Sequence, residues 1–205
     1  MKTIFTSTAA AAMLIVSGLA QAMPVEIVTQ QDTWNYNTTT VDLFSGFTSL
    51  GFSDFTDNYT GANTGQAAFG NSSSGVPAPN TTWAANTDLT LQTTATLSGS
   101  IIGDVTLNLA VDNGAIVFIN GTKVFAESAG GFTSIWEYTQ LIDGSLFNVG
   151  LNTISVMAED HGGATYFDMQ LIALDGVSAA VSEPSTLALL GLGLIGAGLG
   201  KRKRV

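Results

Sequence analysis

The stretch VTLNLAVDNGAIVFINGTKV, residues 105–124, decides the fold. Apolar side chains occupy every second position from Val105 to Val111, which is the pattern of a strand with one buried face. Asp112-Asn113-Gly114 favours a turn, and the apolar run after it predicts a buried strand. That run ends at Asn120-Gly121, a dipeptide that favours a type I′ hairpin turn because both central residues must adopt positive φ. A returning strand is therefore predicted over residues 122–126.

The rest of the chain extends this pattern without any helical periodicity. From Met23 to about Asp88 the pattern is irregular, and short strands with long loops are expected there. Further strands are predicted at residues 25–29, 89–97, 135–142, 152–158 and 165–174. Seven or eight strands separated by turn signals predict an all-β fold, either a β-sandwich or a jelly roll.

Two strings together carry a family resemblance. Residues 105–124 and the later string LFNVGLNTISV, residues 146–156, resemble the hairpin and following strand of galactose-binding-like jelly rolls. The resemblance covers residues 30–174 and implies the fold more than a ligand. It also implies that a structural calcium ion could lie near the edge of the sandwich.

The first 22 residues have the layout of a secretory signal peptide. Lys2 precedes an apolar segment from Ala9 to Val16, and Ala20 and Ala22 place small residues where a signal peptidase reads them. The apolar run is short for an uncleaved anchor. Residues 1–22 are therefore interpreted as a signal helix that is cleaved after Ala22, and residues 23–178 as one β-sandwich domain.

The C-terminus carries a second address signal, whose first part is Ser182-Glu183-Pro184-Ser185-Thr186. The apolar run Leu187–Gly200 would form a helix of roughly 21 Å, short against a hydrocarbon core of about 30 Å, and Lys201–Arg204 would stay on the cytoplasmic side. Residues 182–205 resemble the PEP-CTERM sorting domain of Gram-negative bacteria, although Ser182 replaces the usual first proline. The resemblance implies processing by an exosortase and sorting to the cell surface. An ordinary tail anchor without processing is the alternative.

Composition limits the partners of the body. The chain has 16 acids, six Lys and Arg, and no cysteine. Without both terminal signals, the chain keeps fifteen acidic residues and one basic residue, Lys123, which gives a net charge of about −14. Such a surface repels nucleic acids and anionic lipids, so neutral sugars and divalent cations are better candidates. Stability cannot come from disulfides.

Calcium is the metal that the sequence favours, because its ligands are carboxylate, amide and carbonyl oxygens in loops. The first candidate ligands are Asp112, Asp160 and Asp168, with Asp54 and Asp57 also considered. No calcium-binding motif fixes them, and each could instead be a turn residue or a surface acid. Zinc is disfavoured because His161 is the single histidine.

Sugar binding would need exposed aromatic rings beside hydrogen-bonding side chains. Trp83, in a polar segment, is expected to be the most exposed, and Trp34 is the second candidate. Trp136 and Tyr138 lie at strand spacing and are expected to share a face toward the core. The absence of arginine from the body argues against tight binding of acidic sugars.

Catalysis has weak support in the sequence. His161 lies in a Glu-Asp-His-Gly-Gly loop, but no nucleophile elbow accompanies it. A glycosidase would need two carboxylates at a set separation, and nothing marks a pair among Glu127, Glu137 and Glu159.

Exosortase systems are usually paired with exopolysaccharide production, so the resemblance of the tail implies an exported, surface-sorted and non-enzymatic β-sandwich protein of the exopolysaccharide or biofilm matrix. In this prediction the exosortase is the processing partner, and the membrane is contacted only through the C-terminal segment before processing. A calcium-dependent, lectin-like carbohydrate-binding module is the alternative, and a glycoside hydrolase is a distant third.

Overall fold

The computed structural model describes residues 23–40, 61–71, 77–127 and 135–178. Twelve strands in these ranges form two sheets, in which all pairs are antiparallel except the parallel pair β4–β5. The first sheet has the order β10-β7-β12-β4-β5, with β1 also paired to β12. Its strands are β1 (Val25–Val28), β4 (Phe69–Gly70), β5 (Thr81–Thr82), β7 (Asp104–Asp112), β10 (Tyr138–Asp143) and β12 (Tyr166–Ala173). We call it sheet A.

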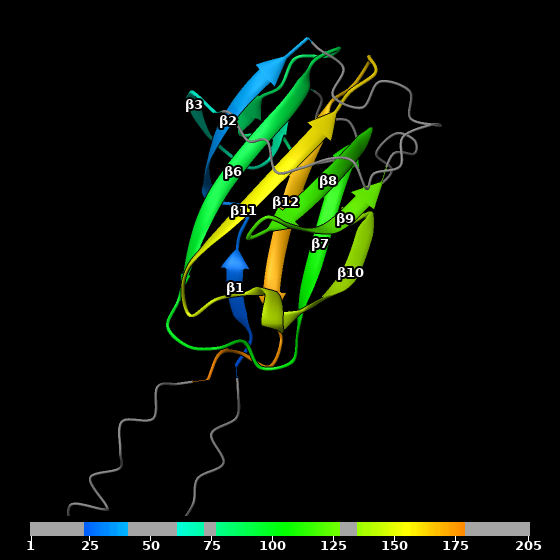
Figure 1. Cartoon of the computed structure of the whole chain (residues 1–205). Coiled ribbons are helices and arrows are strands. Elements are labelled where there is room, and N and C mark those ends of the chain that lie inside the picture. Colours follow the sequence, from blue (N-terminus) through cyan, green and yellow to red (C-terminus); the bar gives the residue numbers. More distant parts are fainter. Residues whose placement is uncertain (1–22, 41–60, 72–76, 128–134, 179–205) are drawn as a thin grey trace, which may run out of the picture.

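The second sheet, sheet B, has the order β3-β2-β6-β11-β8-β9. Its strands are β2 (Thr33–Thr39), β3 (Asn63–Gln66), β6 (Asp88–Leu97), β8 (Gly114–Ile119), β9 (Thr122–Glu127) and β11 (Gly150–Glu159). One 3₁₀ turn, η2 (Gly144–Leu146), precedes β11. Figure 1 shows the two sheets one behind the other. The predicted β-sandwich is confirmed.

The core lies between the sheets, and the period-two pattern of the strands explains why. Leu107 and Leu109 of β7 and Leu89 and Leu91 of β6 belong to one fully buried apolar cluster, although they come from opposite sheets. Aromatic rings also meet across this space: the Trp34 and Phe167 rings pack edge to face with centroids 6.0 Å apart. At about 25 cal/mol per Å² of buried apolar surface, this layer is the main source of stability.

The central stretch turns at both predicted places, and the two turns connect their strands in different ways. Asn120 and Gly121 adopt φ of 50° and 79°, as a type I′ turn requires, and join β8 to β9. The Asp112-Asn113-Gly114 turn does not make a hairpin. It carries the chain from β7 in sheet A to β8 in sheet B, so that the alternating strand and the fully apolar strand lie in different sheets.

Two other predictions need comment. The strand predicted over residues 135–142 begins only at Tyr138, because Ile135 and Trp136 pack on a separate apolar cluster before pairing with β7 starts. The signal helix and the C-terminal helix lie outside the described residues. Within the described ranges, no helix is long and apolar enough to cross a membrane.

Candidate functional site

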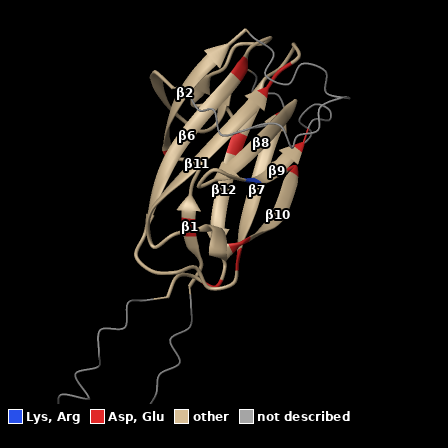
Figure 2. Ribbon diagram, in the orientation of Figure 1, with Lys and Arg blue, Asp and Glu red and all other residues tan. Residues whose placement is uncertain are grey.

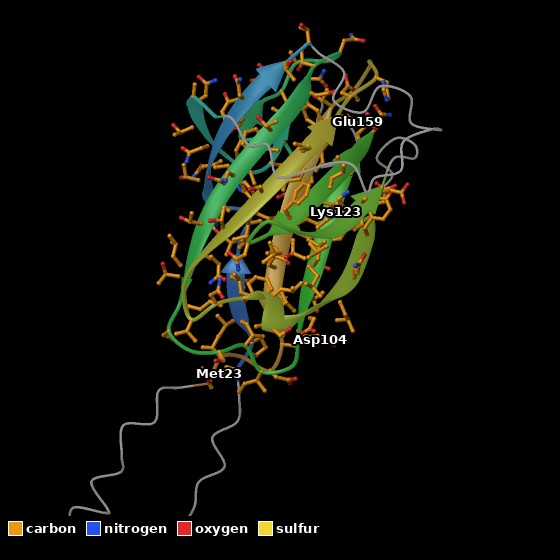
Figure 3. The ribbon with its side chains drawn as sticks, in the orientation of Figure 1. Met23, Asp104, Lys123 and Glu159 are labelled. Atoms are coloured by element: carbon orange, nitrogen blue, oxygen red, sulfur yellow. The ribbon has the colours of Figure 1, made fainter. Side chains whose placement is uncertain are left out.

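The upper end of the sandwich, opposite Met23 in Figure 3, gathers buried acidic side chains. Glu159 ends β11 and lies beside Asp88, which starts β6, because Ala158 pairs with Leu89. Both carboxylates are buried, as is Asp160. The His161 Nε2 atom lies 3.2 Å from Glu159 Oε2, which gives this fully buried glutamate a cationic partner when the histidine is protonated.

Backbone N–H groups fix the loop that follows β11. Asp160 Oδ2 accepts hydrogen bonds from the N–H groups of Asn86 at 2.5 Å and Gly162 at 3.0 Å. The Asp160 N–H donates to Asp88 Oδ1 at 3.2 Å, and the His161 N–H donates to Asn113 Oδ1 at 2.8 Å. The Asp160 Oδ1 atom is buried without a hydrogen-bond partner among the described residues. These bonds fix the conformation of the loop.

Asp168 lies on the outer face of sheet A, yet it is 1% exposed. Its Oδ2 accepts from Gln30 Nε2 at 2.5 Å and from the Tyr166 hydroxyl at 3.4 Å, and its Oδ1 accepts from the Met169 N–H at 2.8 Å. Burial raises the pKa of Asp168 to about 6 against the lowering effect of these bonds. Burial, followed by the Asp168 charge, also raises the pKa of Tyr166.

This carboxyl should make stability depend on pH. Its pKa rises from 3.8 in the unfolded chain to about 6 in the fold, so the folded state keeps the proton longer. Stability from this group is complete below pH 4 and is lost as the pH rises through 6, by roughly 3 kcal/mol. Asp168→Asn should remove that part of the pH dependence, measured by urea unfolding between pH 4 and 8. Asp175→Asn, which changes an exposed acid, is the control, and equal pH profiles for the wild type and Asp168→Asn would contradict the prediction.

A polar ladder crosses the outer face of sheet A in the order β10, β7, β12, β1. Thr139 Oγ1 donates to Asn108 Oδ1 at 3.0 Å, and Asn108 Nδ2 donates to Gln170 Oε1 at 3.3 Å. Gln170 Nε2 then donates to Glu26 Oε1 at 3.1 Å. Side chains on one sheet face stand in register, so the ladder presents amide, hydroxyl and carboxylate groups in one plane.

An aromatic side chain packs on the same face of sheet A as the ladder. Trp136, half-buried, packs with Ile135 on a cluster that contains Ala110 and Tyr166. Ala110 is two residues along β7 from Asn108, and therefore on the same face. A partly exposed indole beside amide groups is the arrangement that sugar rings bind.

The lower end of the sandwich holds an open pocket of about 560 Å³. Asp104 and Asp143 stand directly opposite each other on β7 and β10 and line it together with Ser100, Ile101, Gly103, Gly144, Ser145 and Phe147. The Ser145 N–H donates to Asp143 Oδ1 at 2.8 Å, and this bond lowers the pKa of Asp143. The pocket has both polar and apolar walls, and its two carboxylates are exposed.

The structure corrects the predicted aromatic platform. Trp83 and Trp34 are both 0% exposed, so neither ring face is open to a sugar. Trp83 enters the core because its indole N–H donates to the Thr87 carbonyl at 2.7 Å, which lets a polar segment bury the ring. Trp34 faces inward at its position on β2 and packs on Phe167. Tyr138 does pack against the main core, whereas Trp136 lies on the outer face of sheet A.

The predicted acidic residues do not converge. Asp112 ends β7, Asp160 lies in the loop after β11, and Asp168 lies on β12 with Gln30. Among the residues that the structure describes, no three acidic or histidine side chains form a group that could hold a metal ion. Asp54 and Asp57 lie outside the described residues, as do Ala20, Ala22 and the segment 182–186.

The C-terminal segment matches a known protein-sorting motif. The family description of the PEP-CTERM protein-sorting motif matches residues 180–204. This segment is a PEP-CTERM sorting motif. The match confirms the resemblance seen in residues 182–205, and the motif marks an exported protein with a C-terminal membrane-anchoring segment. The sequence has no match among curated proteins.

Solved structures resemble the body only distantly. A β-glucuronidase from Ruminococcus gnavus in complex with D-glucuronic acid is 13% identical with a TM-score of 0.46, and the alignment covers 74% of this chain but 29% of that one. The PA14 domain of the antifreeze protein MpAFP is 18% identical with a TM-score of 0.39, over 74% and 82% of the two chains. A family 35 carbohydrate-binding module from Clostridium thermocellum is 16% identical with a TM-score of 0.34, over 74% and 98%.

Sequence reasoning missed the polar ladder and the acidic residue Asp88. Asn108 was visible as a polar position on an alternating strand, but its partners Gln170 and Thr139 lie 62 and 31 residues away. Only the strand order brings them together. Pairing the polar positions of predicted neighbouring strands could have suggested the ladder.

Proposed function

We propose that this chain is an exported, surface-sorted and non-enzymatic β-sandwich protein of the extracellular polysaccharide matrix. The PEP-CTERM motif at residues 180–204, placed directly after a β-sandwich body, carries the proposal. In PEP-CTERM systems, the family that this tail resembles, the processing partner is an exosortase, and such systems accompany exopolysaccharide production.

The charge of the body supports this setting. Lys123 is the only Lys or Arg among the described residues, and Figure 2 shows acidic residues at both ends of the sandwich. A surface of one sign keeps copies apart and soluble, and it disfavours binding to anionic polymers unless cations bridge the two. A neutral polysaccharide avoids this repulsion.

The polar ladder on sheet A favours carbohydrate binding as the second candidate function. Its groups both donate and accept hydrogen bonds, as sugar hydroxyls do, and Trp136 supplies an aromatic surface next to it. Asn108→Ala combined with Gln170→Ala should therefore weaken binding to a neutral exopolysaccharide by about tenfold, which corresponds to about 1.4 kcal/mol.

Affinity electrophoresis of the full chain, in gels that contain the exopolysaccharide of the producing organism, measures this effect. Thr94→Ala combined with Thr96→Ala alters exposed side chains of β6 on sheet B and serves as the matched control. Equal retardation of the ladder variant and the control variant would reject sheet A as the binding face. If no neutral polysaccharide retards the chain but the chain still reaches the matrix, carbohydrate binding would be rejected and the structural role would remain.

Calcium belongs to the same proposal as a stabilising ion. The loop of Asp160 is the first place to test, because its Oδ1 is buried without a hydrogen-bond partner among the described residues. Calcium at a hundredfold excess over its Kd should raise stability by about 2.7 kcal/mol, and Asp160→Asn should abolish the increase. Calorimetry with added calcium and then with chelator measures it, and a melting temperature that neither additive moves would count against the ion.

The non-enzymatic assignment is tested by turnover. Glu159, whose Oε2 atom lies 3.2 Å from His161 Nε2, is fully buried and therefore poorly placed to meet a substrate. A glycoside panel should show no hydrolysis by the full chain. Hydrolysis that is lost in Glu159→Gln would instead support the hydrolase alternative.

A further inference from the structure

Exposed apolar side chains of the sandwich collect at its lower end. Among the described residues, the exposed large hydrophobic side chains are Met23, Ile102, Leu141, Val149, Leu151 and Leu174. All except Leu141 lie at that end: Met23 begins the described chain, Ile102 lies between β6 and β7, Val149 and Leu151 flank the start of β11, and Leu174 follows β12. We call these five residues the apolar rim.

Backbone contacts connect the loops that carry Met23, Ile102 and Leu174. The Ile102 N–H donates to the Gly176 carbonyl at 3.1 Å, and Ile101 forms a bridge with Val177. Gly176 has a φ of +74°, and a Cβ on it would lie 2.6 Å from the Met23 carbonyl oxygen. Met23, Ile102 and the segment after Leu174 thus contact one another through their backbones, rather than lying on one loose loop.

The anchoring segment leaves the body from this same end. The described chain ends at Ser178, whose N–H donates to the Ser100 carbonyl at 2.8 Å. Eight residues lie between Ser178 and Leu187, the start of the apolar run, so these two residues can be at most about 32 Å apart when the chain is fully extended. When the run is inserted, Ser178 must therefore lie within that distance of the bilayer, and Ile102 lies beside this segment because its N–H donates to the Gly176 carbonyl.

We propose that the apolar rim rests in the headgroup layer of a zwitterionic bilayer while the C-terminal segment is inserted, holding the sandwich upright on the membrane. Such side chains enter the interface by about 5–10 Å. Asp104, Asp143 and Asp175 lie at the same end and are exposed. Their charges favour zwitterionic over anionic lipid, and the polar ladder on sheet A is left open for ligand.

The test uses the full chain in phosphatidylcholine vesicles that carry nitroxide-labelled lipid. The chain has no cysteine, so Val149→Cys and Thr38→Cys each place one fluorophore, at the rim and at the opposite end of the sandwich. We expect quenching at position 149 to be about threefold stronger than at position 38, as interfacial burial of the rim predicts. Phosphatidylglycerol at low salt should reduce that quenching, and added salt should restore it.

A rim variant then separates the two parts of the proposal. Ile102→Ser, Leu151→Ser and Leu174→Ser together should abolish the difference between the labels, whereas Leu141→Ser, which alters an exposed leucine outside the rim, should keep it. The inference rests on insertion of the tail, so vesicle flotation is measured first. A chain that does not float would overturn both the anchor and the rim contact. A chain that floats with equal quenching at both labels would overturn the rim contact alone.

Discussion

Replacing Asn152 by alanine should lower the free energy of unfolding by roughly 3–5 kcal/mol, the largest loss that we expect from one polar side chain. Asn152 is fully buried. Its Oδ1 accepts from the Asn148 N–H at 2.7 Å and from Asn120 Nδ2 at 2.9 Å, and its Nδ2 donates to the carbonyls of Asn148 at 2.8 Å and Gly150 at 3.1 Å. The alanine would leave these groups without their partner in a buried site.

Urea unfolding of the full chain measures the loss. Asn152→Asp should be about as damaging as the alanine, because two carbonyl oxygens would then face a carboxylate. Asn35→Ala changes an exposed asparagine of β2 and is the matched control, with an expected effect within about 0.5 kcal/mol. A loss below about 1 kcal/mol for Asn152→Ala would contradict the prediction.

Asn120, one of the partners of Asn152, has one role that the sequence predicts and one that it does not. Asn120-Gly121 predicted the hairpin turn, because positive φ at two successive residues is a local requirement. Asn120 also has a distant role, since its Oδ1 accepts from the Thr153 N–H at 2.9 Å and its Nδ2 donates to Asn152 Oδ1. The two strings that carry the family resemblance are therefore joined in space by these asparagines. No local pattern predicts that pairing, since 32 residues separate them.

Burial of individual aromatic residues was the least predictable feature. Trp83 follows polar residues and resembles a surface residue in the sequence, but its indole N–H has an internal acceptor and its carbonyl accepts from Thr165 Oγ1 at 2.6 Å. Trp136 lies two residues before Tyr138, which is the spacing of side chains on one face of a strand. Pairing with β7 begins only at Tyr138, so Trp136 lies outside the strand and packs on a different cluster. Period-two patterns predict faces only inside a paired strand.

Substituting both Glu183 and Pro184 with alanine should strongly reduce release of the protein from the membrane. The motif matched at residues 180–204 places these two residues before the apolar run. Glu183 supplies the one acidic charge of the tail, and Pro184 fixes φ at the start of the predicted helix. Without these two side chains, the processing enzyme should bind and cleave the tail less well, by about tenfold or more. Each 1.4 kcal/mol of lost interaction free energy corresponds to a factor of about ten.

The measurement compares the medium with the membrane fraction of the producing organism, and the mass of the released chain locates the cut. Ser182→Pro is the matched control: it restores the proline usual in the family at this position and should leave release unchanged or increased. The double variant should accumulate at full C-terminal length in the membrane, still exported and folded. Equal release of the double variant and the wild type would mean that the processing enzyme does not recognise Glu183 and Pro184. Retention of the wild type itself, with Lys201–Arg204 intact, would make the segment an ordinary tail anchor, because only a processed chain loses its basic terminus.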